Sequence, residues 1–154
     1  MLWDYSYDLR RTHPGSTVII DYEEKDGVNE LNEFKRIYVC LKTLVNGFHA
    51  GCRKLIGLDG CHTKGIHRQQ ILTAVSIDAN NGWWPLAWAV VEQENQATWA
   101  WFLNYLQLDL RILIDPLFAH PSIGLSQVIN FSGVRVSNHR DILKNKECQS
   151  SCEV

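Results

Sequence analysis

The sequence QILTAVSIDANNGWWPLAWAVV, residues 70–91, contains two strand-like runs on either side of an Asn-Asn-Gly triplet. Through residues 70–79, Ile71 and Thr73 share one face while Leu72 and Ala74 share the other, which is the period of a β-strand. An Asn-Gly pair between two such runs is the strongest short-range signal of a β-hairpin. Two antiparallel strands are therefore predicted, over residues 70–79 and 83–91. Pro85 cannot donate to a neighbouring strand, so we expect the second strand to lie at the edge of the sheet.

The residues on either side of this hairpin extend the pattern to a mixed α/β fold. Residues 55–59 and 17–20 form two further runs of strand length. Asn95 is a suitable N-cap for an amphipathic helix that would cover the sheet. The apolar positions of that helix are Trp99, Phe102, Leu103, Leu106 and Leu110. A second helical spacing runs through Leu31, Phe34, Tyr38, Leu41 and Val45, and it closes at Gly47, which suits the left-handed residue beyond a helix end.

The composition is that of one globular domain. The chain has 154 residues, of which 45% are hydrophobic and 21% are charged. Its longest apolar run, residues 83–91, is far shorter than the roughly 20 residues of a membrane-spanning helix, and its first residues are acidic where a signal peptide is basic. We therefore expect a soluble intracellular protein with no membrane partner, whose five cysteines are reduced thiols.

The formal net charge is only −2, but the charges are unevenly placed. Residues 1–34 carry eight acids and three bases, whereas residues 35–72 carry seven bases and a single acid, Asp59. The basic segment could contact the phosphates of DNA, or it could form a solvated surface. A pI near 6.3 argues against strong nucleic-acid binding by this domain alone. The candidate DNA contacts are Arg53, Lys54, Lys64 and Arg68.

Asp59 closes the apolar run of residues 55–58 and directly precedes Gly60. Three antiparallel strands followed by a covering helix are how a ribonuclease H-like domain begins. The chemistry of that fold requires acids on adjacent elements that hold two divalent cations about 3.5–4 Å apart. Carboxylates suit Mg²⁺ or Mn²⁺, and Asp59 at the end of the first strand is placed to bind one. Taken alone, an Asp-Gly pair would instead open a turn.

Several motifs of this sequence stand in a recognisable order. They read FKR at residues 34–36, GFHAGCR at 47–53, IGLDGCHTKG at 56–65, LTAV at 72–75, DANN at 78–81, PLAWAVVE at 85–92 and ENQATWAWFL at 94–103. In this order they resemble the catalytic domain of Mutator-like element (MULE) transposases, a family abundant in plants. The resemblance covers residues 14–111, and the set of motifs is far more specific than any one of them.

The resemblance implies an incomplete ribonuclease H-like domain of a cut-and-paste DNA transposase, with an Asp, Asp, Glu triad and Mg²⁺ or Mn²⁺. Asp59 matches the first acid and would bind metal. Asp115, which closes the apolar run of residues 112–114, is one candidate for the second acid, although the motif's basic residues do not follow it; another alignment puts His120 there. The third acid is expected farther downstream than Val154. We therefore expect a truncated copy that does not cleave DNA by itself.

The expected organisation is an N-terminal extension over residues 1–30, a truncated transposase domain over 31–115 and a divergent, poorly structured tail over 116–154. The family implies a nuclear location, weak DNA binding, and a transposase or host protein as partner. Three functions remain open. The chain could be a defective transposase remnant that binds DNA weakly, or a host-recruited DNA-binding or protein-interaction domain without nuclease activity. It could also be a small metal-dependent nuclease that uses Asp59 and Asp115.

The remaining polar and aromatic residues have structural explanations. Asp78 is predicted to belong to the hairpin turn, and Glu94 to the first turn of the following helix. Zinc ligand types occur at Cys52, Cys61, His62 and His67, but their spacing matches no standard finger. Tryptophans that could stack on bases but whose spacing favours core packing are Trp83, Trp84, Trp88, Trp99 and Trp101.

Overall fold

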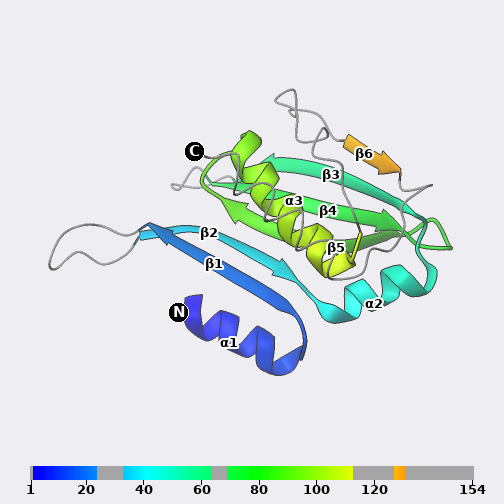
Figure 1. Ribbon diagram of the computed structural model, residues 1–154, viewed down its shortest axis with the longest axis horizontal. Helices are drawn as coiled ribbons and strands as arrows, with labels where there is room; N and C mark the ends of the chain where they lie inside the picture. The colour runs from blue at the N-terminus through cyan, green and yellow to red at the C-terminus, as the bar shows by residue number, and fades with distance from the viewer. Residues whose placement is uncertain (1, 24–32, 64–68, 113–126, 131–154) are drawn as a thin grey trace, which may run out of the picture.

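The computed structural model describes residues 2–23, 33–63, 69–112 and 127–130, and the described elements form a mixed α/β arrangement (Figure 1). The helices are α1 (Leu2–Thr12), α2 (Lys42–Gly51) and α3 (Gln96–Leu110). The strands are β1 (Thr17–Glu23), β2 (Glu33–Cys40), β3 (Leu55–His62), β4 (Gln70–Ile77), β5 (Trp83–Val91) and β6 (Gln127–Asn130). These strands form one sheet in the order β1-β2-β5-β4-β3-β6, with all neighbours antiparallel. The predicted α/β class is confirmed.

The hairpin predicted at residues 80–82 is confirmed, and it joins β4 to β5. One carboxylate oxygen of Asp78 accepts hydrogen bonds from the backbone N–H groups of Asn80 at 2.8 Å and Gly82 at 2.7 Å. Asn81 adopts a left-handed φ of 65°, which asparagine tolerates better than most residues. The turn is therefore built by the side chains that the sequence places there, and Asp78 has the turn role expected of it.

The predicted edge position of the third strand is wrong, because β5 lies between β2 and β4. β2 pairs with β5 only from Ala87 to Val90, so Pro85 lies in a part of the strand that β2 does not reach. The pairing with β4 also shifts its register between Ala74 and Val75, and Val75 is the partner of Pro85. A proline is compatible with a central strand where one side is unpaired and the ladder is already irregular.

The helix predicted over residues 31–47 is wrong in its first half. Residues Glu33–Cys40 form β2, and α2 begins only at Lys42. The last four residues of β2 are all buried, and a strand covered on both faces loses the alternation that distinguishes it from a helix. β1 confirms the strand predicted at residues 17–20, and its pairing with β2 places part of the expected N-terminal extension in the same sheet.

Gly47 does not end a helix as predicted, because it lies inside α2 with an ordinary helical backbone. A methyl group added to Gly47 would lie 2.3 Å from carbon Cζ2 of Trp84. The indole N–H of Trp84 donates to the backbone oxygen of Leu44 at 3.0 Å, which holds the ring against α2. Glycine is required here by the close approach of a strand residue, and a local pattern cannot show such an approach.

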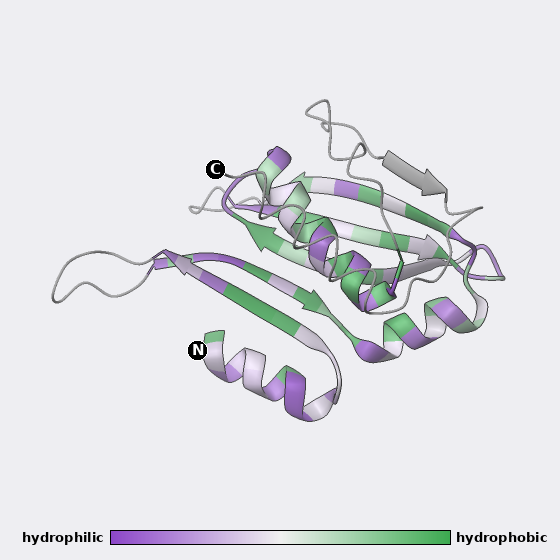
Figure 2. Cartoon of the chain, in the orientation of Figure 1, coloured by the Kyte–Doolittle hydropathy of each residue, from purple (hydrophilic) through white to green (hydrophobic). Residues whose placement is uncertain are grey.

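The larger core lies on the face of the sheet that α2 and α3 cover (Figure 1). The helical residues in this core are Val45, Phe48, Trp99, Phe102, Leu103, Leu106 and Leu110. The other face carries a smaller cluster of Val18, Ile37 and Val39, against which Leu9 of α1 packs. Figure 2 shows the matching hydrophobic segments in the middle of β1 and along β5. The covering helix predicted after the third strand is confirmed as α3.

The sequence pattern does not predict α1, which packs beside β1. The guanidinium of Arg10 donates to the backbone oxygen of Val18. The rings of Trp3 and Tyr22 stack with their centroids 5.4 Å apart. Much of the helix is nonetheless exposed, including Trp3 at 66% and Tyr7 at 68%. Leu9 packs against the smaller core cluster, whereas the other large apolar residues of α1 are exposed.

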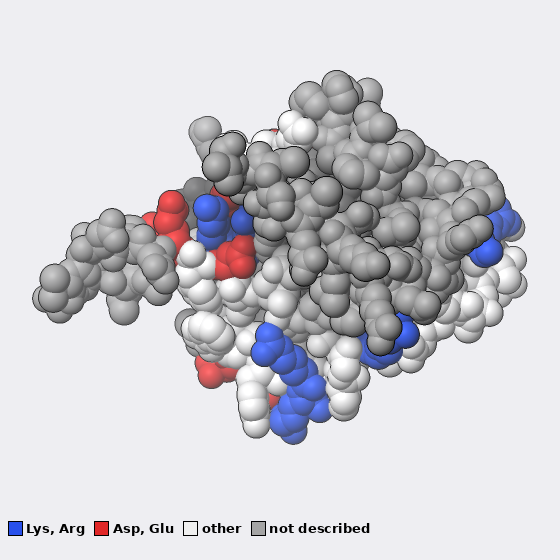
Figure 3. All heavy atoms as spheres, viewed as in Figure 1, with Lys and Arg blue, Asp and Glu red and all other residues white. Residues whose placement is uncertain are grey.

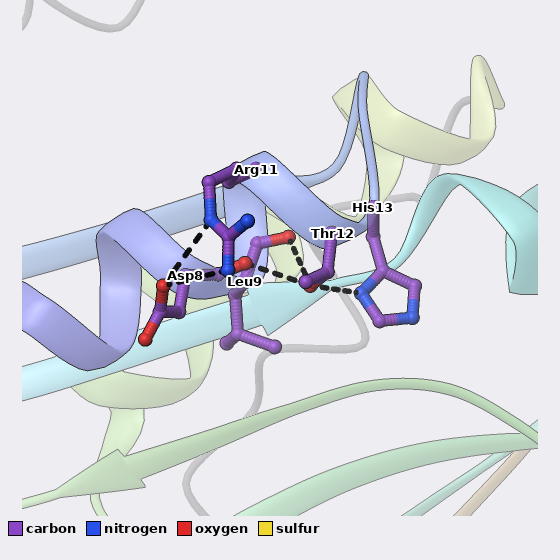
Figure 4. A network of polar contacts seen from close by, with 5 residues as sticks. All are labelled: Asp8, Leu9, Arg11, Thr12 and His13. Carbon is purple, nitrogen blue, oxygen red and sulfur yellow. Dashed lines mark hydrogen bonds and ion pairs between the residues drawn. The ribbon is translucent and has the colours of Figure 1, made fainter.

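Polar contacts at the end of α1 close the helix (Figure 4). The Thr12 hydroxyl donates to the backbone oxygen of Asp8 at 2.7 Å and lies 2.9 Å from Nδ1 of His13. Arg11 forms an ion pair with Asp8 at 3.4 Å. All but the partly exposed Leu9 and His13 are exposed, so these contacts satisfy a helix end and build no enclosed site.

Candidate functional site

Asp59 lies inside β3, three residues before its end, rather than at the end of the strand as predicted. Its partner across the ladder is Thr73 of β4, whose hydroxyl donates to the backbone oxygen of Asp59 at 3.2 Å. The Asp59 side chain is exposed. Asp59 therefore opens no turn, and it stands on a strand as the metal-site interpretation requires.

The two faces of β3 carry different residues around this position. Leu58 belongs to the core beneath α3, so strand alternation directs Asp59 to the opposite face. On that opposite face the ladder aligns Asp59 with Thr73, and Thr73 in turn with Trp88 of β5. The residues aligned with Asp59 across β4 and β5 are thus Thr73 and Trp88, and neither carries a negative charge.

A second carboxylate, that of Glu94, lies beside Gly60, the residue that follows Asp59 in β3, but on the other face of the sheet. A methyl group added to Gly60 would lie 2.8 Å from both oxygens of Glu94. The Glu94 carboxylate also accepts a hydrogen bond from the indole N–H of Trp99 at 3.0 Å. Glu94 precedes the N-cap Asn95, so it does not lie in the first turn of α3 as predicted. The sheet separates Asp59 from Glu94, so the two carboxylates do not belong to one site.

Asp115 and His120 lie outside the described residues, as do Lys64, Arg68 and His67. In the part of the chain that the structure describes, no three His, Cys, Asp or Glu side chains are grouped so that they could hold a metal ion. Among the described residues, Cys40, Cys52 and Cys61 form no disulfide with one another.

Arg53 and Lys54 lie between α2 and β3, and both side chains are exposed. The Arg53 guanidinium donates to the side-chain oxygen of Asn81 in the β4–β5 turn. Its backbone N–H donates to the oxygen of Ile77 at 2.8 Å, and its own oxygen accepts from the Ser76 hydroxyl at 3.1 Å. These bonds hold the two bases at one end of the sheet.

Basic side chains are scattered over the face shown in Figure 3. The described Lys and Arg side chains stand there in separate groups, one of them beside acidic residues, and not in one continuous stripe. A continuous positive stripe is the usual electrostatic footprint of a strong DNA-binding surface.

The predicted core packing of the tryptophans holds for four of the five. Trp99 is buried, and Trp84, Trp88 and Trp101 are partly buried against the two core clusters. The core-packing prediction is wrong for Trp83, which is 77% exposed at the start of β5. The next residue, Trp84, packs against α2, so strand alternation directs Trp83 to the opposite face of the sheet.

Comparison of the chain with protein-family models, with curated proteins and with solved structures finds no match. None of the described helices is long and apolar enough to cross a membrane.

Proposed function

We propose that this chain is a domain derived from a Mutator-like transposase, which contacts DNA weakly and does not cut it by itself. The observation that carries the proposal is the position of Asp59. The motif of residues 56–65 identifies this acid, and it is exposed on a strand that opens a β-β-β-α unit. Such a unit is compatible with the first half of a ribonuclease H-like domain, in which the first acid lies on that strand.

We infer that the chain does not cut DNA from the number of carboxylates that a two-metal site requires. Two divalent cations about 3.5–4 Å apart require several carboxylates on one side of the sheet. Asp59 and Glu94 lie on opposite faces of β3, so among these two only Asp59 is available to such a site. Binding of Mg²⁺ or Mn²⁺ by Asp59 is then weak, and transposition requires acids supplied from elsewhere.

Cleavage can be measured directly on the purified chain with Mg²⁺ or Mn²⁺ and with nicked DNA, duplex DNA and RNA–DNA hybrid. The proposal expects no cutting of any of the three. Cutting that disappears in Asp59→Asn would overturn it and favour the small nuclease. Calorimetry with Mn²⁺ on the native chain and on Asp115→Asn then shows whether Asp115 is the second ligand.

DNA contact is assigned to Arg53 and Lys54, whose positions are held by the β4–β5 turn. Each phosphate contact adds about 0.9 to the slope of log affinity against log salt concentration. Fluorescence anisotropy with a labelled duplex between 50 and 200 mM salt should therefore show a slope near 2. Lys54→Glu should lower this slope by about 1. The matched control is Arg11→Glu, which changes the same charge at an equally exposed site on α1 and should leave the slope unchanged.

An interaction domain without DNA contact is the second candidate, and the exposed face of α1 favours it. Leu2, Trp3, Tyr5 and Tyr7 are large apolar residues with at least 39% exposure each. Exposed apolar groups of this kind mark many protein-binding surfaces. If the duplex does not bind even at 50 mM salt, this candidate replaces the DNA-binding proposal, with a host protein or a transposase as the partner. In either case the proposed location is the nucleus, which a fluorescent fusion protein would test.

A further inference from the structure

A cavity of about 280 Å³ lies between α2 and the C-terminal end of α3, the two helices that meet at the lower right of Figure 1. Its lining residues are Lys42, Val45, Asn46, His49, Asp109 and Arg111. The four from α2 follow the spacing of one helical face, so they line the cavity over two turns. The cavity is far from the Asp59 face of the sheet, since Asp59 and α2 lie on opposite sides.

The polar groups of this wall are mostly donors and cations. Lys42 and Arg111 are positively charged, and neither forms an ion pair with a carboxylate among the described residues. Asn46 and His49 can both donate hydrogen bonds from side-chain nitrogen. The backbone N–H of Lys42 donates to the Ser16 hydroxyl at 2.9 Å, which fixes the position from which the lysine side chain extends.

Asp109 is the one acid in the lining, and hydroxyl groups of β1 and β2 donate to its carboxylate. One of its oxygens accepts from the Thr17 hydroxyl at 2.6 Å and the other from the Tyr38 hydroxyl at 2.8 Å. Burial raises the pKa of Tyr38 above its ordinary value, so this phenol stays protonated and continues to donate. Both carboxylate oxygens therefore accept from hydroxyl groups of the sheet, and the two cations of the lining outnumber its single acid.

Arg111 ends α3 in a conformation that glycine usually occupies. Its φ is 54° and its backbone N–H donates to the oxygen of Gln107. A left-handed conformation costs an ordinary residue on the order of 1 kcal/mol compared with glycine. A cation at a helix C-terminus is favourable in itself, but a cation elsewhere in the last turn of α3 would gain the same benefit without the left-handed backbone. Ligand contact from this position would explain why arginine stands here.

We propose that this cavity binds a phosphate group, with Lys42 and Arg111 balancing its charge and with Asn46 and His49 donating hydrogen bonds to its oxygens. The volume lies just below the roughly 300–1,000 Å³ of ordinary small-molecule sites. It admits a phosphate with a small organic substituent. The phosphate of a small phosphomonoester and a backbone phosphate of DNA share this chemistry. The inference does not depend on the transposase proposal, because it uses none of the residues assigned there.

The test is a titration of the full chain with inorganic phosphate and with glucose 6-phosphate at constant ionic strength, followed by amide NMR shifts. Saturable shifts in α2 and at the end of α3 are expected. Arg111→Gly removes the cation and relieves the backbone strain, so it should fold at least as well as the native chain and weaken binding at least tenfold. Lys42→Gln should weaken binding to a similar degree. Arg11→Gln, which removes an exposed cation of α1 outside the cavity, should leave the binding unchanged.

Non-saturating shifts, or native affinity in a folded Arg111→Gly, would overturn the inference, and so would equal weakening in Arg11→Gln. A parallel titration with duplex DNA identifies the source of the phosphate. Arg111→Gly that loses phosphate affinity but keeps DNA affinity indicates a small phosphomonoester, whereas loss of both indicates a DNA phosphate. Failure of the transposase proposal would appear differently, as cutting that depends on Asp59 or as duplex binding insensitive to Lys54→Glu.

Discussion

Gly47→Ala tests the packing of α2 on the sheet. In an exposed helix interior, this change should stabilise the protein by about 1 kcal/mol, because alanine loses less backbone entropy than glycine. In α2 the new methyl group would lie 2.3 Å from carbon Cζ2 of Trp84. Carbon atoms in ordinary contact are about 3.5–4.0 Å apart. Either the helix or the indole must therefore move by roughly 1.2 Å or more.

The indole cannot move without loss. Its N–H donates to the backbone oxygen of Leu44 at 3.0 Å, a bond whose removal costs about 1 kcal/mol. Forcing an extra methylene into a packed core costs a further ~1–3 kcal/mol. After the gain in helix propensity is subtracted, the net destabilisation is about 1–3 kcal/mol. For a chain of this length, each kcal/mol lowers the melting temperature by about 2–4 °C.

Calorimetry and urea unfolding would measure this loss, and Gly51→Ala is the matched control. Gly51 is the last residue of α2, and a methyl group there would have no neighbour within 4 Å. Its replacement should change the stability by less than about 0.5 kcal/mol. In a Trp84→Ala background, Gly47→Ala should become neutral or stabilising, since the obstructing ring is gone. Equal effects of Gly47→Ala and Gly51→Ala in the native background would refute the reasoning.

Three further predictions follow from the described contacts. Stability should fall as the pH rises above about 9. Burial raises the pKa of the Cys40 thiol to about 12 and that of Tyr38 above its ordinary value. The folded chain therefore holds protons that the unfolded chain has released at this pH. The urea midpoint should thus be lower at pH 10.5 than at pH 8, by less in Cys40→Ala, and a flat profile would contradict this assignment. Asn95→Ala should cost about 1 kcal/mol, since Asn95 and Thr98 exchange capping hydrogen bonds at 2.9 and 3.0 Å, whereas the exposed neighbour Gln96→Ala should change little. Trp83→Ser should leave the melting temperature nearly unchanged because this ring is 77% exposed, while Trp99→Ala, at 1% exposure, should cost about 3–5 kcal/mol; similar losses from both would show that Trp83 is packed.

Local signals predicted the elements whose hydrogen bonds close within a few residues. The β4–β5 turn depends on Asp78 and on the left-handed Asn81, which are neighbours in the chain. The start of α3 depends on the reciprocal bonds of Asn95 and Thr98. These interactions form whatever the rest of the chain does, so a short stretch of sequence is enough to predict them.

Local sequence signals predicted only part of the candidate site. The motif around residues 56–65 identified Asp59, but the strand that contains it continues to His62, and the face it occupies became clear only from the ladder with β4. Glu94 was expected in a helix turn, and it instead lies over Gly60. The cavity between α2 and α3 was not predicted at all, because its residues come from two helices that are separated by three strands in the chain.

The sequence by itself determined the strand and helix periods, the turn between residues 78 and 82, and the cap of α3, since these depend on backbone dihedral angles and hydrogen bonds between near neighbours. Only the tertiary structure decided that Glu33–Cys40 is a strand, that β5 is central despite Pro85, and that Gly47 must remain glycine. Each of these features arises when a segment buries its apolar surface against a distant partner. Such burial outweighs weak local preference, and its result appears only in the folded chain.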